Sequence, residues 1–121
     1  MAKRVYRPEY AESWALIVGV NRYRYVPPLS YACNDARAVA DVLKDSFGFP
    51  EDHVTLLLDD DADRDTIRRT FLAFDDKRVG PDDRLLVFYA GHGHTQLGNR
   101  GEVGFLVPVD GRIDDLSSRA R

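Results

Sequence analysis

An apolar run that ends abruptly in glycine and histidine constrains this chain more than any other feature. The six residues Leu85–Ala90 are all apolar or aromatic, and the segment Gly91-His92-Gly93-His94 follows at once. A run this short predicts a strand buried on both faces of a sheet, not a membrane span. Open parallel sheets gather their chemistry at the carboxyl ends of the strands, so we expect His92 at that edge.

The composition is that of one soluble globular domain. The chain has 121 residues, of which 44% are hydrophobic and 31% charged, enough for a single core. The net charge of -3 is spread along the chain, so we expect neither a nucleic-acid nor a membrane partner. The single cysteine, Cys33, excludes an internal disulfide, and without a signal peptide or a membrane-length segment we expect a cytoplasmic protein.

Strand and helix patterns alternate along the chain. Residues 1–12 form a polar lead-in, and residues 13–121 form the main domain. A buried strand is expected over Trp14–Val20, then a loop over Asn21–Ser30, then a helix that ends at Gly48 and Pro50. The apolar residues of this helix fall on one face at helical spacing and are Ala32, Ala36, Val39, Ala40, Leu43 and Phe47.

A second strand and helix precede the apolar run. The second strand is expected over Val54–Leu58, followed by the acidic turn Asp59–Asp61, and Asp63 is a candidate N-cap for the second helix. The apolar stripe of this helix is Ile67, Phe71 and Phe74, and its stop signals are Lys77, Arg78, Gly80 and Pro81. After the apolar run we expect a polar turn over Gln96–Glu102 and an extended piece over Val103–Val109.

This order predicts a three-layer α/β/α sandwich with a mainly parallel sheet. The loop after Gly19, the acidic turn at Asp59 and the glycine-histidine loop would then meet at one edge. The third strand, apolar on both faces and expected to be central, needs a neighbour on each side, and none follows it in this sequence. The sandwich is therefore incomplete in this chain, and we expect a longer parent protein or a second chain to cover that strand.

Five segments, in this order and spacing, together resemble a known family. They are Trp14 to Tyr23, Leu29 to Ala36, Leu57 to Arg64, Leu85 to His94, and Gly104 to Asp110. The combination resembles the N-terminal, p20-like half of a caspase-like cysteine peptidase, with the metacaspases and bacterial caspase homologues as the most similar branch. The resemblance covers nearly all of residues 13–110.

The resemblance implies roles for three residues. His92 matches the histidine of a Cys-His dyad, which takes the proton of the thiol and returns it to the leaving amine. The backbone N–H of Gly93 matches an oxyanion-hole donor. Asp35 matches the acidic residue that gives metacaspases their preference for cleavage after Arg or Lys, a guanidinium contact that a carboxylate suits. The implied partners are a peptide or protein substrate and the part of the peptidase that carries the cysteine.

The sequence departs from the family at several positions. Ala90 stands where the family usually has Ser, which weakens the polar lining of the substrate pocket. The segment Leu97–Glu102 has one carboxylate where type I metacaspases have a calcium-binding acidic cluster, so we expect no calcium, and we expect no other cofactor. Caspases carry the nucleophile roughly 50 residues after the histidine, and this chain ends sooner. We therefore expect the chain alone to be inactive. Arg119 and Arg121 are candidate self-processing sites if the parent enzyme cleaves after Arg.

Alternatives remain open for the function. The domain could be a non-catalytic, pseudoenzyme or assembly module. His92 and His94 could ligate a metal in a hydrolase, together with Asp59 or Asp61, although spacing identifies no third ligand. His92 could also be an ordinary loop histidine at the end of a strand.

Other residues have structural interpretations as well. Asp35 in the first turn of a helix is favoured by the helix dipole whatever else it does. Cys33 could have a depressed pKa at the helix start, but a small buried cysteine is the favoured interpretation. We expect His53 at the surface and Asp59–Asp61 as a solvated turn.

Overall fold

A computed structural model of the chain describes residues 10–74, 79–99 and 101–112. The predicted stop residues Lys77 and Arg78 and the candidate processing sites Arg119 and Arg121 lie outside the described residues. The elements are, in order, β1 (Ser13–Gly19), α1 (Ala32–Phe47), β2 (Val54–Leu58), α2 (Arg64–Ala73), β3 (Arg84–Ala90), β4 (Gly93–Gly98) and β5 (Gly101–Leu106). Short 3₁₀ turns, η1 (Glu51–His53) and η2 (Asp59–Asp61), flank β2.

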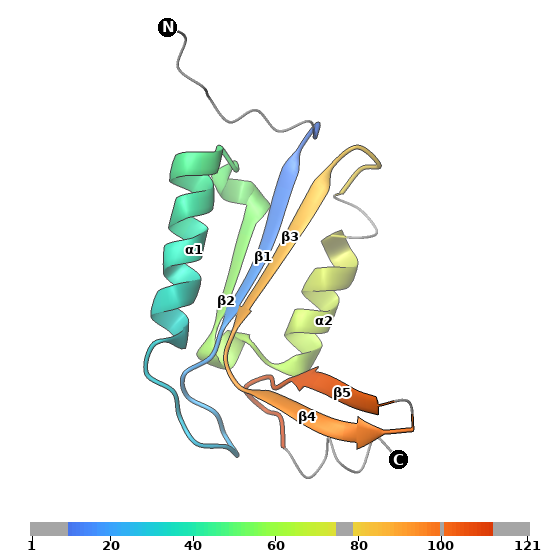
Figure 1. Cartoon of the computed structure of the whole chain (residues 1–121). Helices are drawn as coiled ribbons and strands as arrows, with labels where there is room; N and C mark the ends of the chain where they lie inside the picture. The colour runs from blue at the N-terminus through green and yellow to red at the C-terminus, as the bar shows by residue number, and fades with distance from the viewer. Residues whose placement is uncertain (1–9, 75–78, 100, 113–121) are drawn as a thin grey trace, which may run out of the picture.

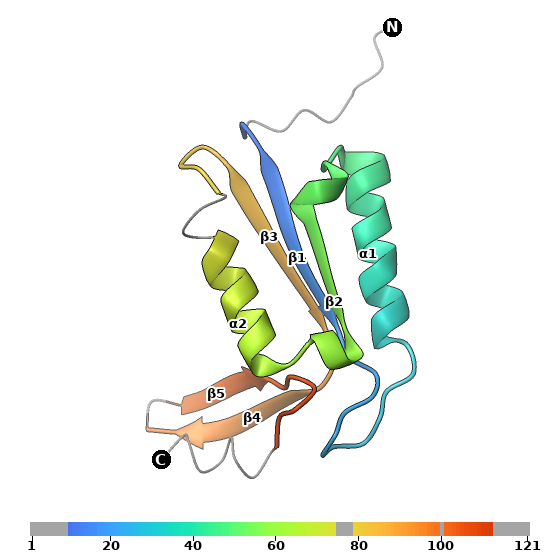
Figure 2. The same cartoon turned by 180° about the vertical axis from the view of Figure 1, so that it is seen from behind.

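Strands β1, β2 and β3 form a parallel sheet in the order β2-β1-β3. Figure 1 shows α1 on one face and α2 on the other, and the view from behind in Figure 2 agrees. The side chains of β1 alternate between the two faces: Ala15 and Ile17 pack with α1, and Leu16 and Val18 lie in the cluster on the α2 side. The predicted α/β sandwich with a mainly parallel sheet is therefore confirmed. No helix among the described residues is long and apolar enough to span a membrane.

Small residues let α1 lie close to the sheet. A Cβ added at Gly19 of β1 would lie 2.7 Å from the Cβ of Ala36 in α1, so a larger residue would push the helix away. The helix ends at Gly48, whose φ of 71° lies in the left-handed region that glycine favours. Phe47, predicted to face the core, stands in the last turn of the helix and is 41% exposed.

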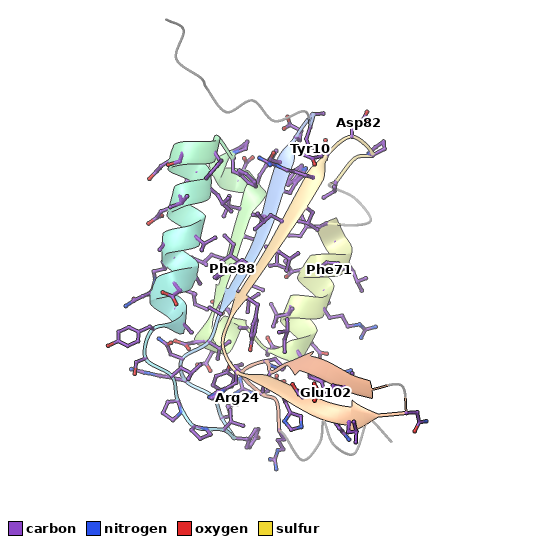
Figure 3. The ribbon with its side chains drawn as sticks, viewed as in Figure 1. Tyr10, Arg24, Phe71, Asp82, Phe88 and Glu102 are labelled. Atoms are coloured by element: carbon purple, nitrogen blue, oxygen red, sulfur yellow. The ribbon has the colours of Figure 1, made fainter. Side chains whose placement is uncertain are left out.

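The predicted apolar stripe of α2 is only partly buried. Phe74, just after the helix, is 1% exposed and packs edge-on against Trp14 with ring centroids 6.2 Å apart. Phe71, labelled in Figure 3, was expected in the core but is 44% exposed. The stripe extends past the sheet, because β3 is the last strand that the described residues supply on this side.

The position of β3 differs from the prediction. The central strand is β1, and within the described residues no strand pairs with the outer edge of β3. Leu86 and Val87 of β3 are consequently 36% and 50% exposed, where the sequence predicts burial on both faces. The strand itself is where it was expected, and in the part of the chain that the structure describes its outer edge has no partner strand.

The segment after His92 is a hairpin: β5 overlaps the predicted extended piece Val103–Val109, whereas the predicted polar turn Gln96–Glu102 is largely strand. Strands β4 and β5 pair antiparallel, with Gly98 opposite Gly101 at the closed end. His94 and Gln96 are half-buried while Thr95 and Leu97 are exposed, which is strand periodicity. Glycines hid this signal, because they lower strand propensity. Figures 1 and 2 show the hairpin running outward from the carboxyl end of β3, beside the start of α2.

The opposite, amino edge of the sheet is closed by aromatic and hydrogen-bonded side chains. His53, expected at the surface, stacks on Trp14 at 3.6 Å between ring centroids and keeps a side-chain exposure of only 13%. Its Nδ1 lies 3.1 Å from the carbonyl oxygen of Ser13. In Figure 3, Tyr10 and Asp82 mark this edge, and the N–H of Ala11 donates to the carbonyl of Asp82 at 3.0 Å.

Acid should weaken this edge through Asp83. Its carboxylate accepts hydrogen bonds from the N–H of Gly80 at 2.8 Å and from the Trp14 indole at 3.1 Å, and these lower the pKa of Asp83 below 3.8. A lowered folded-state pKa means that the ionised carboxylate stabilises the fold above pH 3.8, and that this contribution is lost as the pH falls through the folded-state pKa.

We therefore expect Asp83→Asn to reduce the free energy of unfolding at neutral pH and to make it less sensitive to acid. Urea unfolding of both proteins across the acidic range measures this. The exposed neighbour provides the control variant, Asp82→Asn, which should keep the native acid dependence. Parallel pH curves for native protein and Asp83→Asn would contradict the assignment.

Candidate active site

Three loops meet at the carboxyl edge of the parallel sheet, as the sequence predicts. Gly19 at the end of β1 pairs in register with Ala90 at the end of β3, and the N–H of Val20 donates to the carbonyl of Ala90 at 3.0 Å. The loop after β1 therefore starts beside the loop that carries His92. The turn after β2 joins them, because the side chain of Asp59 contacts the start of the β1–α1 loop.

His92 is held by its backbone and by its ring. Its N–H donates to the Tyr23 hydroxyl at 2.6 Å, and its carbonyl accepts from the N–H of Val107 at 3.0 Å. The ring nitrogen Nε2 lies 2.8 Å from the carbonyl oxygen of Pro27. The Tyr23 and His92 rings are tilted against each other with centroids 4.9 Å apart. The side chain is thus fixed by two residues of the β1–α1 loop.

The Pro27 contact determines the tautomer of His92. A carbonyl oxygen only accepts hydrogen bonds, so Nε2 must carry the proton. In the neutral imidazole the lone pair then lies on Nδ1, which can accept a proton from a nucleophile. When Nδ1 becomes protonated, the Pro27 carbonyl stabilises the positive charge on the ring. The contact therefore leaves His92 with a protonated Nε2 and a lone pair on Nδ1.

Two tyrosine hydroxyls hydrogen-bond to the backbone of His92. The Tyr89 hydroxyl donates to the carbonyl of Val107 at 2.6 Å and lies 2.8 Å from the carbonyl of His92. The Tyr23 hydroxyl, 3.1 Å away, donates to Tyr89 while accepting from the N–H of His92. Burial, followed by the Tyr23 contact, raises the pKa of Tyr89, which keeps its phenol a donor. Gly91 has to be glycine because its Cβ would collide with both hydroxyls.

Residues 107–110 tie this site to the rest of the fold. The N–H of Val109 donates to the carbonyl of Ala62, and the N–H of Arg24 donates to the carbonyl of Val109, both at 3.0 Å. Asp110 accepts the N–H of the first residue of α2 at 3.0 Å. Val109 is fully buried. The segment after the hairpin therefore fixes the β1–α1 loop and the start of α2 to one another.

The other two predicted site residues lie at the same edge. Asp35 is exposed in the first turn of α1, where its N–H donates to the carbonyl of Tyr31 at 2.9 Å. Gly93 is the first residue of β4, exposed, and next to His92 in the chain. The described residues show no contact between Asp35 and His92, so the structure brings these residues to one edge without linking them directly.

Cys33 is not a reactive thiol in this structure. It is 2% exposed, and its sulfur faces the carbonyl oxygen of Gly19 at 3.5 Å. Burial, followed by the charge of Asp59, raises its pKa. The alternative of a depressed pKa is therefore wrong, and the small buried cysteine is confirmed. Among the described residues no three His, Cys, Asp or Glu side chains gather where they could hold a metal, so the metal alternative finds no ligand set there.

Sequence reasoning missed several residues that hold His92. Tyr23 and Tyr89 lie in the segments that carry the family resemblance, but no role was predicted for their hydroxyls, although a buried tyrosine hydroxyl needs a partner. The Pro27 carbonyl has no sequence signal, because every residue has one. The acidic turn was expected to be solvated, yet Asp59 is half-buried and accepts two backbone hydrogen bonds.

The fold and this edge define an α/β sandwich with a site centred on one fixed histidine. Comparison with known families then identifies the class more narrowly: the caspase domain family matches residues 12–119. The chain therefore belongs to the caspase domain family, peptidase family C14. It is also 30% identical over 122 residues to Metacaspase-2 of Arabidopsis thaliana, covering 90% of this chain and 28% of that relative. The chain thus spans less than a third of the length of this relative.

Proposed function

We propose that this chain is the histidine-bearing part of a cysteine endopeptidase that cleaves after Arg or Lys. His92 serves as the general base of a Cys-His dyad, and the cysteine lies outside this chain. The thiolate of that cysteine attacks the scissile carbonyl of the substrate. This forms a thioester acyl-enzyme and releases the amine, which takes its proton from the His92 imidazolium. Water then hydrolyses the thioester with His92 again acting as base. The backbone N–H of Gly93 stabilises the tetrahedral oxyanion.

The observation that carries this proposal is the hydrogen bond from His92 to the Pro27 carbonyl at 2.8 Å. A histidine at the end of a strand without a chemical role needs no fixed tautomer. Here the backbone on both sides of the ring is hydrogen-bonded as well. Such fixing of both the orientation and the tautomer is what a general base requires.

The surface beside the outer edge of β3 supports the proposal that a second part of the peptidase, which carries the cysteine, packs there. A groove of about 710 Å³ lies between α2, β3 and the hairpin. The exposed apolar residues that line it are Phe71, Leu72, Val87 and Leu106. Exposed apolar surface of this kind, beside a strand edge that no described strand pairs with, is normally covered by another element. We propose that the part of the peptidase that carries the cysteine pairs with β3 and covers this groove.

Asp35 supplies the preference for Arg or Lys in this proposal. A carboxylate at the site edge can pair with a guanidinium in bidentate geometry. We expect Asp35→Ala in the full-length protein to lower kcat/KM for Arg-terminated peptides roughly 30-fold or more, because truncating one partner of a desolvated charge pair costs about 2–5 kcal/mol. Initial rates on fluorogenic peptides ending in Arg, Lys or Asp measure this.

The matched control for this experiment is Asp41→Ala, which removes another exposed carboxylate from the same helix. It should leave the preference unchanged. Cleavage after Asp by the native protein would contradict the proposed specificity. Equal loss for Arg and neutral peptides in Asp35→Ala, with the fold intact, would show that the carboxylate does not read the substrate.

A further inference from the structure

Asp59 holds an unusual backbone conformation next to the site. It is the first residue after β2, and its φ of 47° is in the left-handed region, which Asp and Asn adopt more readily than other residues with a side chain. Its Oδ1 accepts the N–H of Asn21 at 2.8 Å and the N–H of Arg22 at 3.0 Å. One carboxylate oxygen from the end of β2 thus fixes the start of the β1–α1 loop.

Asn21 closes this loop on itself. Its carbonyl accepts the N–H of Leu29 at 2.8 Å, and its side-chain oxygen accepts the N–H of Cys33 at 3.2 Å. Both ends of residues 21–29 and the first turn of α1 therefore meet at Asn21. Two of the groups that contact His92, the Tyr23 hydroxyl and the Pro27 carbonyl, lie within this closed loop.

The carboxylate of Asp59 is a strong acceptor. Burial by itself would raise the pKa of Asp59, but the hydrogen bonds from Arg22 and Asn21 outweigh burial and lower it. Hydrogen bonds to an ionised oxygen are about twice as strong as those between neutral groups. The neighbouring Asp60, by contrast, has a side chain 89% exposed, and its contact with Arg24 is 3.9 Å long.

We propose that Asp59 is a positioning residue for His92. It fixes the loop that presents the Tyr23 hydroxyl and the Pro27 carbonyl, and through them it sets the orientation and the tautomer of the imidazole. Asp59 acts through the loop and touches no reacting atom. The inference rests on the proposed role of His92 as general base. It gives a role to Asp59, the first residue of an acidic turn that the sequence predicts to be solvated.

Kinetics on the full-length protein test this role. Asp59→Ala should lower kcat about 10–100-fold with little change in KM, because a catalytic group displaced by about 1 Å can lose that much rate. Asp59→Asn keeps an oxygen acceptor and tolerates the left-handed conformation, so it should retain most of the native kcat. The matched control is Asp61→Ala, which removes a charge from an exposed residue of the same turn and should leave kcat unchanged.

The nitrogen NMR shifts of the His92 imidazole, with His92→Gln for assignment, give a readout independent of cleavage. We expect the tautomer protonated at Nε2 in the native protein and in Asp59→Asn, and a mixture of tautomers in Asp59→Ala. Unchanged imidazole shifts and kcat in a folded Asp59→Ala would overturn the proposal. If Asp59→Ala does not fold, Asp59→Gly takes its place, because it also removes the oxygen acceptor and adopts the left-handed conformation without strain. Mixed tautomers in Asp59→Gly would support the proposal, and native imidazole shifts with native kcat in Asp59→Gly would overturn it. A native protein without peptidase activity would refute the proposed function, while the imidazole shifts would still decide the role of Asp59.

Discussion

Replacing His92 with alanine in the full-length protein is expected to lower kcat for cleavage after Arg by about 10²–10⁴-fold, the range that a positioned general base contributes. In the proposed mechanism the imidazole takes the thiol proton and returns it to the leaving amine, and the substitution removes both steps. The fold should persist, because His92 is half-buried at the rim and not part of either core cluster. Initial rates on an Arg-terminated fluorogenic peptide, with a circular dichroism spectrum of each protein, provide the measurement.

The neighbouring histidine provides the matched control. His94 lies two residues further on in β4, opposite Phe105, and His94→Ala should keep most of the native rate. Equal losses in the two variants would favour a shared role, such as the metal alternative. Unchanged activity in His92→Ala would remove the dyad altogether, and a native protein that cleaves no peptide would favour a non-catalytic module.

Gly91→Ala should damage both activity and stability. The added Cβ would collide with the Tyr23 hydroxyl and lie 2.6 Å from that of Tyr89. Since these hydroxyls hold the N–H and the carbonyl of His92, the methyl group must displace the histidine. We expect kcat to fall about 100-fold from misplacement of the base and the free energy of unfolding to fall by about 1–3 kcal/mol from overpacking.

Steady-state kinetics and urea unfolding of the same preparations measure the two effects of Gly91→Ala. The control is Gly104→Ala in β5, where an added Cβ would meet nothing within 4 Å. This variant should match the native protein in both assays. Native kcat and stability in Gly91→Ala would show that the Tyr23 and Tyr89 hydroxyls can move aside at little cost. The position of His92 would then not depend on these hydroxyls.

The fold was predictable where local patterns and tertiary packing agree. The strand Val54–Leu58 matches the prediction residue for residue, and the helix Ala32–Phe47 spans the predicted apolar stripe and ends before Gly48, because strand formers, helical spacing and a terminal glycine all indicate the same structure there. The exposure of Phe71 and Leu86 was not predictable, since local sequence does not reveal which neighbour is absent. The hairpin was missed because the four glycines from Gly93 to Gly104 indicate turns more strongly than strands.

The site was predictable only in part, for a similar reason. His92 stands out because it interrupts an apolar strand pattern, and the parallel topology then places it at the carboxyl edge. Its partners are a carbonyl in a loop, two hydroxyls in apolar segments and backbone N–H groups, and these come together only through tertiary structure. The hydrogen bonds to Asp59 were hidden in the same way, since an acidic run is usually solvated.

The structure of the full-length protein tests the central claim most directly. We expect a cysteine on a strand paired with the open edge of β3, with its sulfur about 3–4 Å from Nδ1 of His92, within reach for proton transfer. Nε2 should still donate to the Pro27 carbonyl. A β3 edge covered by a strand without a cysteine, or a His92 ring turned away from the thiol, would contradict the account.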